Sequence, residues 1–208
     1  TAAEVARINA LLPPDVVLHG GLVVRKSFTP RESASHREYE YLLPVEALGA
    51  GGVEALDSAL RLFEGTHRFH NFCSGLRHKE EKVGHFSHAE LLGDSVSWPL
   101  ALPIDSNDPA PYRTVLSCRV HRTLDVNGEL YAVVRIAGFS FVLHQIRHMV
   151  GSALAIVHNL VPRKAVEVAL SSPLLLNVSP LAPGKGLLLN RIGWFDVHKG
   201  VSEFVLSR

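Results

Sequence analysis

The sequence is poor in several features that mark large classes of protein. It has two cysteines and one methionine among 208 residues, and neither cysteine belongs to a Cys-x-x-Cys pair. No apolar run reaches the ~18 residues of a membrane-spanning helix. The chain also lacks a Gly-x-Ser-x-Gly elbow, a phosphate-binding loop and a dinucleotide fingerprint. We therefore expect free thiols in a reducing compartment, no membrane partner and no nucleotide cofactor, and the hydrolase and nucleotide-dependent classes lose most of their support.

The composition is that of a chain that can build a sizeable core. Hydrophobic residues make up 47% of it and charged residues 20%, proportions that exclude a disordered chain. The formal net charge of +1 at pH 7 leaves the partner undetermined. Twelve histidines are many for this length, and several stand beside Arg or Lys, so one basic face is compatible with the balanced total.

Residue periodicity divides the chain into strand-like and helix-like segments. Tyr39 and Tyr41 alternate with glutamates, as in a half-buried strand, and Asn127-Gly128 is a strong β-hairpin signal. This order of segments predicts an α+β fold, with helices packed on one face of a mostly antiparallel sheet. The predicted segments are strands at 37–43, 114–124 and 130–137, helices at 2–12, 53–63, 144–160 and 162–170, extended pieces at 16–28 and 186–197, and a largely irregular insertion at about 75–111.

One arginine stands where an apolar strand pattern passes into a predicted helix. Arg147 follows Ile146 and precedes Met149 and Val150 on the apolar stripe of that helix. A guanidinium group is seldom buried without a carboxylate or phosphate to accept its forked N–H donors. Arg147 is therefore either a functional residue or one half of a structural ion pair.

Histidine spacing offers a weaker alternative. His144 and His148 stand at i, i+4 on the same predicted helix, which is the spacing of a zinc-binding pair. Glu does not follow His144, and the sequence shows no third ligand. A metal-dependent hydrolase is therefore a distant hypothesis, and we assign no metal site.

Five motifs, in the same order, resemble those of the TruA-type tRNA pseudouridine synthases, and in particular their eukaryotic branch. Phe139–Gly151 is similar to the family's Phe-x-x-x-Gln-Ile-Arg-x-Met-Val-Gly, and Ala182–Leu189 resembles its closing Ala-Pro-x-x-Gly-Leu-x-Leu. These two are the specific signals. The other three are Asn9–Val16, which resembles Asn-x-x-Leu-Pro-x-Asp-Ile, Phe28–Tyr41, which resembles a strand ending in Arg-x-Tyr-x-Tyr, and Gly65–Phe72, which resembles Gly-Thr-His-Asn-Phe-x-Asn-Phe.

The resemblance implies that specific uridines in tRNA are isomerised to pseudouridine without a cofactor: the base is detached from its ribose, turned and rejoined through carbon. Arg147 matches the family arginine that pairs with the catalytic aspartate. Tyr39 matches the pocket tyrosine, which we expect against the base with its hydroxyl placed for proton transfer. We assign Arg147 and Tyr39 as catalytic and tRNA as the partner. The implied substrate-binding residues are Leu187, Phe69, Asn71, Gln145 and Arg68, the last at a position where the family has Asn.

The family's nucleophilic aspartate lies in an Arg-Thr-Asp-x-Gly-Val-His motif upstream of the Asn-x-x-Leu-Pro segment, and no Arg-Thr-Asp occurs here. We therefore expect the C-terminal portion of a synthase, inactive alone. In this interpretation 1–35 is a remnant of an N-terminal domain and connection, and 36–208 is a catalytic-type domain with the insertion at about 75–111. The alternative is a non-catalytic RNA-binding module derived from such an enzyme. The expected location is intracellular, in the nucleus or mitochondrion or in the cytoplasm, and the oligomeric state is open.

Overall fold

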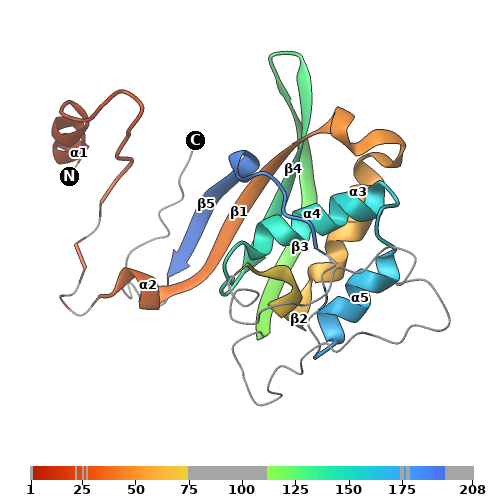
Figure 1. The fold of residues 1–208 in the computed structure, drawn as a ribbon. Helices are drawn as coiled ribbons and strands as arrows, with labels where there is room; N and C mark the ends of the chain where they lie inside the picture. The colour runs from red at the N-terminus through yellow and green to blue at the C-terminus, as the bar shows by residue number, and fades with distance from the viewer. Residues whose placement is uncertain are drawn as a thin grey trace, which may run out of the picture. The chain divides into compact units, whose positions relative to one another are not determined.

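A five-stranded sheet is the frame of the structure, which is a computed structural model. Its strands run in the order β2-β3-β4-β1-β5, and the β1–β4, β2–β3 and β3–β4 pairs are antiparallel (Figure 1). The structure describes residues 2–21, 23–24, 26, 28–74, 112–173, 176 and 179–194. The strands are β1 (Ala34–Pro44), β2 (Gly65–Arg68), β3 (Tyr112–Val126), β4 (Glu129–Gly138) and β5 (Leu187–Trp194).

The chain divides into two units, and the candidate site and all of the sheet except the first two residues of β1 and the last residue of β5 belong to His36–Gly193. Thr1–Ser35 and Trp194–Arg208 form the other unit, and the division of the chain into domains at 1–35 and 36–208 stays a prediction. This unit contains the helices α1 (Ala2–Asn9) and α2 (Pro30–Ser33). The origin of the first 35 residues as a domain remnant stays a prediction.

The β3–β4 hairpin confirms the turn signal of Asn127-Gly128. Both residues have positive φ, 56° and 85°, as the tight hairpin turn requires. Asp125 accepts a hydrogen bond from the Gly128 N–H (2.9 Å), and Val126 pairs with Glu129 across the turn. The two strands are longer than predicted because each hydrogen-bonded pair of the ladder supports the next.

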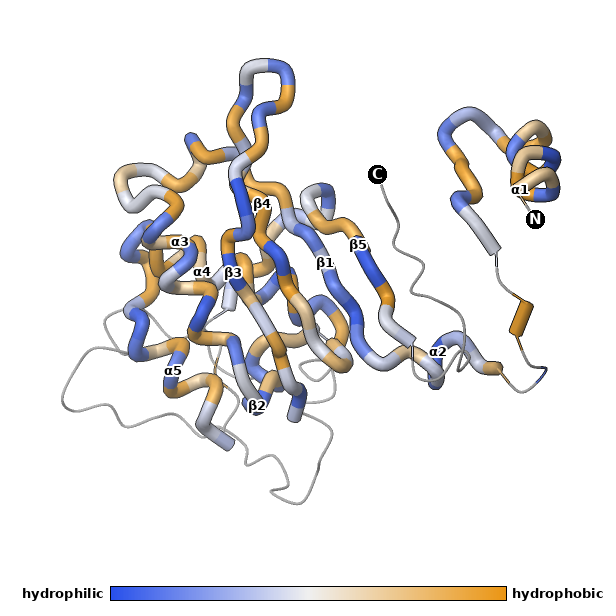
Figure 2. Tube along the Cα trace, turned by 180° about the vertical axis from the view of Figure 1, so that it is seen from behind, coloured by the Kyte–Doolittle hydropathy of each residue, from blue (hydrophilic) through white to orange (hydrophobic). Residues whose placement is uncertain are grey.

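Helices cover one face of the sheet and bury its apolar side chains. Figure 1 shows α3, α4 and α5 in front of the strands, and Figure 2 shows the sheet from the other side. Tyr41 pairs with Val134 and Cys118 with Ile136 on the covered face, and all four side chains are at most 1% exposed. The helical segments of this unit are α3 (Gly52–Leu60), α4 (Gln145–Val157), α5 (Arg163–Ser171), and the 3-10 turns η1 (Val45–Gly51), η2 (Arg61–Phe63), η3 (His70–Phe72) and η4 (Gly184–Gly186).

The predicted α+β fold, with an antiparallel sheet and helices, is confirmed. The helix predicted at 2–12 ends at Asn9, ahead of Pro13-Pro14, and the one predicted at 144–160 ends at Val157. The described part of 16–28 contains no strand. The predicted insertion at about 75–111 lies outside the described residues. In the part of the chain that the structure describes, every helix is too short or too polar to cross a membrane.

Gly151 lets α4 approach the segment that leads into β5. A Cβ atom at this position would overlap the Pro180 carbonyl oxygen and lie 2.9 Å from its carbonyl carbon and 3.1 Å from the Ala182 nitrogen. These neighbours are backbone atoms, which cannot rotate away. Glycine is therefore required for close contact, although it sits inside a helix where alanine would be intrinsically favoured.

We expect Gly151→Ala to destabilise the protein by about 1–3 kcal/mol, because the overlap with backbone outweighs the ~1 kcal/mol gain in helix propensity. Chemical denaturation measures the change. Gly21→Ala is the matched control, since a Cβ there would meet no atom within 4 Å. Equal stability of the two variants would contradict the close packing of α4 on 180–182.

The buried thiol of Cys118 makes stability depend on alkaline pH. Burial raises the pKa of this thiol, and the nearby Glu64 and Asp57 carboxylates raise it further. A raised pKa in the folded state gives a contribution that is complete below the unfolded pKa and lost above it. Since a thiol in an unfolded chain titrates near ~8.5, the free energy of unfolding should fall from that pH upward.

We expect the wild-type protein to lose up to about 1.4 kcal/mol per pH unit through this thiol between roughly pH 9 and 10, and Cys118→Ala to show a smaller slope. Urea denaturation at pH 7, 8, 9 and 10 measures both slopes. Identical slopes in the two proteins would mean that Cys118 ionises as easily in the folded chain as in the unfolded one.

Candidate functional site

Arg147 lies in the first turn of α4, where the segment before β5 passes beside it. Its Nε donates a hydrogen bond to the Ala182 carbonyl (2.7 Å), and the Ala182 N–H donates to the Arg147 carbonyl (3.1 Å). The ion pairs among the described residues all involve other cations. The guanidinium is thus half-buried and held by backbone, and within the described residues its terminal N–H groups have no carboxylate partner.

The start of α4 is fixed by the residues just before Arg147. His144 adopts a left-handed backbone conformation, with φ 61°, and forms the N-cap. Gln145 is 1% exposed, and its side-chain oxygen accepts the Val142 N–H (2.9 Å) while its amide nitrogen lies 3.7 Å from the Met149 sulfur. These contacts close the first turn, so the Arg147 side chain leaves the helix in a defined direction.

Two tyrosines of β1 lie on the same face of the sheet but differ in their surroundings. Tyr41 is 1% exposed, and its hydroxyl donates to the Pro183 carbonyl. Burial raises the pKa of Tyr41, and the positive charge of Arg147 opposes that shift. Tyr39 is half-buried, its ring meets the Phe141 ring edge-on with centroids 5.5 Å apart, and its hydroxyl has no partner within the described residues.

The segment Ala182–Leu187 closes the site from the β5 side. A Cβ on Gly186 would lie 2.7 Å from the Leu42 carbonyl oxygen and 2.8 Å from the Tyr41 ring, so the backbone passes close to β1. A Cβ on Gly184 would be 3.7 Å from the Arg147 guanidinium carbon. Leu187 follows, half-buried against the core, on the strand next to β1.

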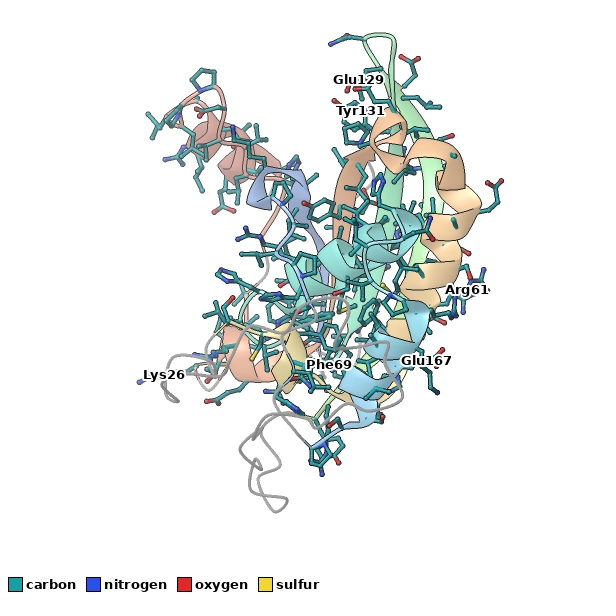
Figure 3. The ribbon with its side chains drawn as sticks, turned by 45° about the vertical axis from the view of Figure 1, so that its right-hand side comes forward. Lys26, Arg61, Phe69, Glu129, Tyr131 and Glu167 are labelled. Carbon is teal, nitrogen blue, oxygen red and sulfur yellow. The ribbon has the colours of Figure 1, made fainter. Side chains whose placement is uncertain are left out.

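The predicted residues of β2 and η3 have structural partners of their own. Phe69 is fully buried against Phe72, with centroids 6.2 Å apart, and lies among packed side chains in Figure 3. The Asn71 side chain donates to the Ala169 carbonyl (3.0 Å) and accepts the Leu176 N–H (2.6 Å). It therefore ties α5 to the chain beyond it. A direct contact of Phe69, Asn71 or Gln145 with substrate stays a prediction.

Arg68 is a half-buried residue at the end of β2. Its Nε donates to the Tyr112 hydroxyl (2.6 Å), and its guanidinium carbon lies 5.0 Å from the centroid of the Tyr112 ring. This cation–π arrangement orients the charged group while leaving it able to meet a further acceptor.

The two histidines that suggested a metal site take part in a hydrogen-bond chain instead. The Ser74 hydroxyl lies 2.8 Å from His144 Nδ1 and 3.2 Å from His148 Nε2. The other ring nitrogen of His148 lies 3.0 Å from the Ser179 carbonyl oxygen, and the Ser179 hydroxyl donates to the Asn71 carbonyl (2.7 Å). Both nitrogens of His148 are engaged. Among the described residues there is no group of three potential metal ligands.

Surface hollows lie away from these residues. One, between α3 and β3, has a volume of about 400 Å³, and Asp57, Arg61 and Arg122 are among its lining residues. A second, of about 510 Å³, lies between η1 and the end of α4. Neither is lined by Arg147, Tyr39 or Leu187. In the hollow between α3 and β3, the Asp57 carboxylate is already occupied by Arg61 (2.8 Å) and by the Val120 N–H (2.9 Å).

The structure therefore brings Arg147, Tyr41 and the 182–187 segment together, with Tyr39 and Leu187 on neighbouring strands. Sequence reasoning missed the roles of Tyr41, Gly151 and the Pro183 carbonyl. Tyr41 shares the face of Tyr39, so strand alternation could have indicated it. The other two act through backbone, and no side-chain pattern reveals a backbone contact between distant segments.

The structure is thus an α+β domain, in which an antiparallel sheet is backed by helices and an arginine is held at the start of one helix. Residues 101–194 match a family described as tRNA pseudouridine synthase. The chain is 29% identical over 200 residues to the human "Pseudouridylate synthase 1 homolog", covering 89% of this chain and 40% of that protein. It is 24% identical to "tRNA pseudouridine synthase A 2" of Desulfotalea psychrophila, covering 89% of this chain and 66% of that protein.

A shorter match, to "tRNA pseudouridine synthase 1" of Yarrowia lipolytica, is 31% identical over 133 residues and covers 64% of this chain and 20% of that protein. These matches are all to pseudouridine or pseudouridylate synthases. It spans about 40% of the length of its human relative.

The geometry predicts that Arg147 contributes little to folding. We expect Arg147→Ala to lower the free energy of unfolding by about 1 kcal/mol. The substitution removes one side-chain hydrogen bond, and it breaks no ion pair among the described residues. Arg135→Ala is the contrasting variant and should cost more, because Arg135 lies 2.9 Å from Glu40 and 3.5 Å from Glu38. Urea denaturation compares them. A larger loss for Arg147→Ala would identify it as a structural cation.

Proposed function

We propose that this chain is the arginine-bearing C-terminal part of a tRNA pseudouridine synthase. The observation that supports this most strongly is the state of Arg147. Its Nε is fixed on the Ala182 carbonyl, while its terminal N–H groups have no carboxylate partner within the described residues. A half-buried cation held ready in this way suits a carboxylate that comes from outside this sequence.

The reaction exchanges one bond to the ribose for another. The bond from C1′ to N1 of uracil breaks, the base turns, a bond from C1′ to C5 forms, the hydrogen on C5 leaves as a proton, and N1 takes up a proton, so that the product is an isomer of the substrate. A carboxylate nucleophile, the family's aspartate, would need to be ionised and oriented. A cation within ~4 to 6 Å favours the ionised form, and this is the role that we assign to Arg147.

Tyr39 and Leu187 are the residues that we assign to the uracil base. The Tyr39 ring is half-buried beside Phe141, and its hydroxyl has no hydrogen-bond partner among the described residues. The ring can therefore contact the base, and the hydroxyl can take part in the transfer of the C5 proton. Leu187 supplies an apolar wall on the adjacent strand. A base extracted from the RNA fold gains from such aromatic and apolar surroundings.

The tRNA is the partner that we propose for the exposed part of the site. Arg68 can reach a phosphate while stacked on Tyr112, whereas Phe69, Asn71 and Gln145 would support the pocket from within. We further propose that residues 1–35 derive from an N-terminal domain and that the protein acts in the nucleus, mitochondrion or cytoplasm, where tRNA is found.

The test is tritium release from tRNA labelled at C5 of uridine, because the C5 hydrogen leaves when pseudouridine forms. The enzyme is the whole protein that contains this chain and the aspartate motif. We expect Arg147→Ala to reduce turnover on the order of 10²-fold or more, as is typical when an electrostatic partner of the reacting groups is removed. Lys164→Ala is the control, because it removes one exposed positive charge from α5.

Turnover of Arg147→Ala within a factor of about two of the unsubstituted protein would reduce Arg147 to a structural role. The 208-residue chain alone should bind tRNA without releasing tritium. Release by that chain would show that its nucleophile lies within the sequence. An inactive whole protein that still binds tRNA would favour the RNA-binding module.

A further inference from the structure

Tyr41 is a second tyrosine at this site, and its hydroxyl has a different task from that of Tyr39. A buried phenol needs a hydrogen-bond partner, because an unsatisfied hydroxyl in the core costs free energy. The Tyr41 hydroxyl finds it in the Pro183 carbonyl, 142 residues further along the chain. The contact reaches from β1 to the segment that carries Ala182, the partner of Arg147.

The carbonyl groups of Ala182 and Pro183 are held by two different elements. The Ala182 carbonyl accepts Arg147 Nε from α4, and the Pro183 carbonyl accepts the Tyr41 hydroxyl from β1. They belong to successive peptide units, which are planar and joined at one Cα atom. Rotating one carbonyl away from its donor therefore disturbs the other.

Close contacts on both sides leave this segment little room. Gly186 passes so near to Tyr41 that a Cβ there would lie 2.8 Å from the ring, and Gly184 lies beside the Arg147 guanidinium. On the N-terminal side, Gly151 allows contact with Pro180. The close contacts limit where the segment can lie, and the hydrogen bond from the Tyr41 hydroxyl fixes the direction of the Pro183 carbonyl. Phenylalanine has no hydroxyl and could not make this bond.

We propose that Tyr41 is a positioning residue for Arg147: by holding the Pro183 carbonyl it sets the Ala182 carbonyl, which in turn aims the guanidinium at the reacting carboxylate. The proposal rests on the proposed function for its catalytic consequence. Its structural half concerns only residues of this chain. A phenol is protonated at neutral pH, as a permanent donor must be, and burial raises the pKa of Tyr41 further from that range.

A purely structural tyrosine would stabilise the protein without controlling Arg147. The exchange of the Arg147 Nε–H with water separates these possibilities, because a hydrogen bond to a fixed carbonyl slows it. We expect Tyr41→Phe in the 208-residue chain to raise this exchange rate about tenfold or more, as measured by NMR of ¹⁵N-labelled protein. Arg147→Lys, which lacks this group, assigns the signal.

Tyr131→Phe is the matched control. This substitution also removes a tyrosine hydroxyl, at the end of the β3–β4 hairpin. The Tyr131 hydroxyl donates a hydrogen bond to Glu129 (2.6 Å), and Figure 3 labels both residues. We expect this variant to leave the Arg147 exchange rate unchanged. An unchanged rate in Tyr41→Phe as well, with both variants folded by circular dichroism, would overturn the proposal.

Activity supplies the second readout. In the whole protein we expect Tyr41→Phe to lower kcat about tenfold with KM for tRNA nearly unchanged, because the ring and the RNA surface remain while the aim of Arg147 is lost. Faster exchange with an unchanged kcat would overturn the catalytic half of the proposal. An unsubstituted protein without activity would refute the proposed function instead, and the exchange result would still decide whether Tyr41 positions Arg147.

Discussion

The reciprocal pairing of Arg147 with Ala182 is the interaction on which the candidate site depends. It joins the first turn of α4 to a segment 35 residues later through one side-chain and one backbone hydrogen bond. The arginine is oriented by a carbonyl and not by a carboxylate. Its charge is therefore not neutralised by the contact that holds it, and it remains able to attract an anion.

This arrangement separates folding from chemistry. The half-buried guanidinium loses part of its hydration and, within the described residues, recovers one hydrogen bond at Nε. Close packing at Gly151 and Gly186 supports the neighbouring backbone without contributing charge. Within the described residues the terminal N–H groups of Arg147 have no carboxylate partner, and a charged group with such donors to spare can bind an anion.

A second set of polar groups completes the interior without facing the site. Ser179 links Asn71 in η3 to His148 in α4, and Asn71 holds α5 and the chain beyond it. The Asn71, His148 and Ser179 side chains are buried, and each takes part in the hydrogen bonds given above. Asn71, which the sequence motif suggests as a substrate contact, therefore also holds the fold together. A buried amide must have hydrogen-bond partners whatever the function of the protein.

Local patterns in the sequence were enough to predict the α+β fold and the β3–β4 hairpin, and they identified Arg147 as a candidate site residue. Asn127-Gly128 needs positive φ at both positions, and an arginine among apolar neighbours needs an acceptor; both are properties of adjacent residues. The tertiary structure alone decided which acceptor Arg147 uses and that Tyr41 reaches Pro183. These contacts join residues 35 and 142 positions apart through backbone carbonyls, which every residue possesses. The side-chain pattern therefore could not distinguish them, and only the packing of α4 and β5 against β1 selects them.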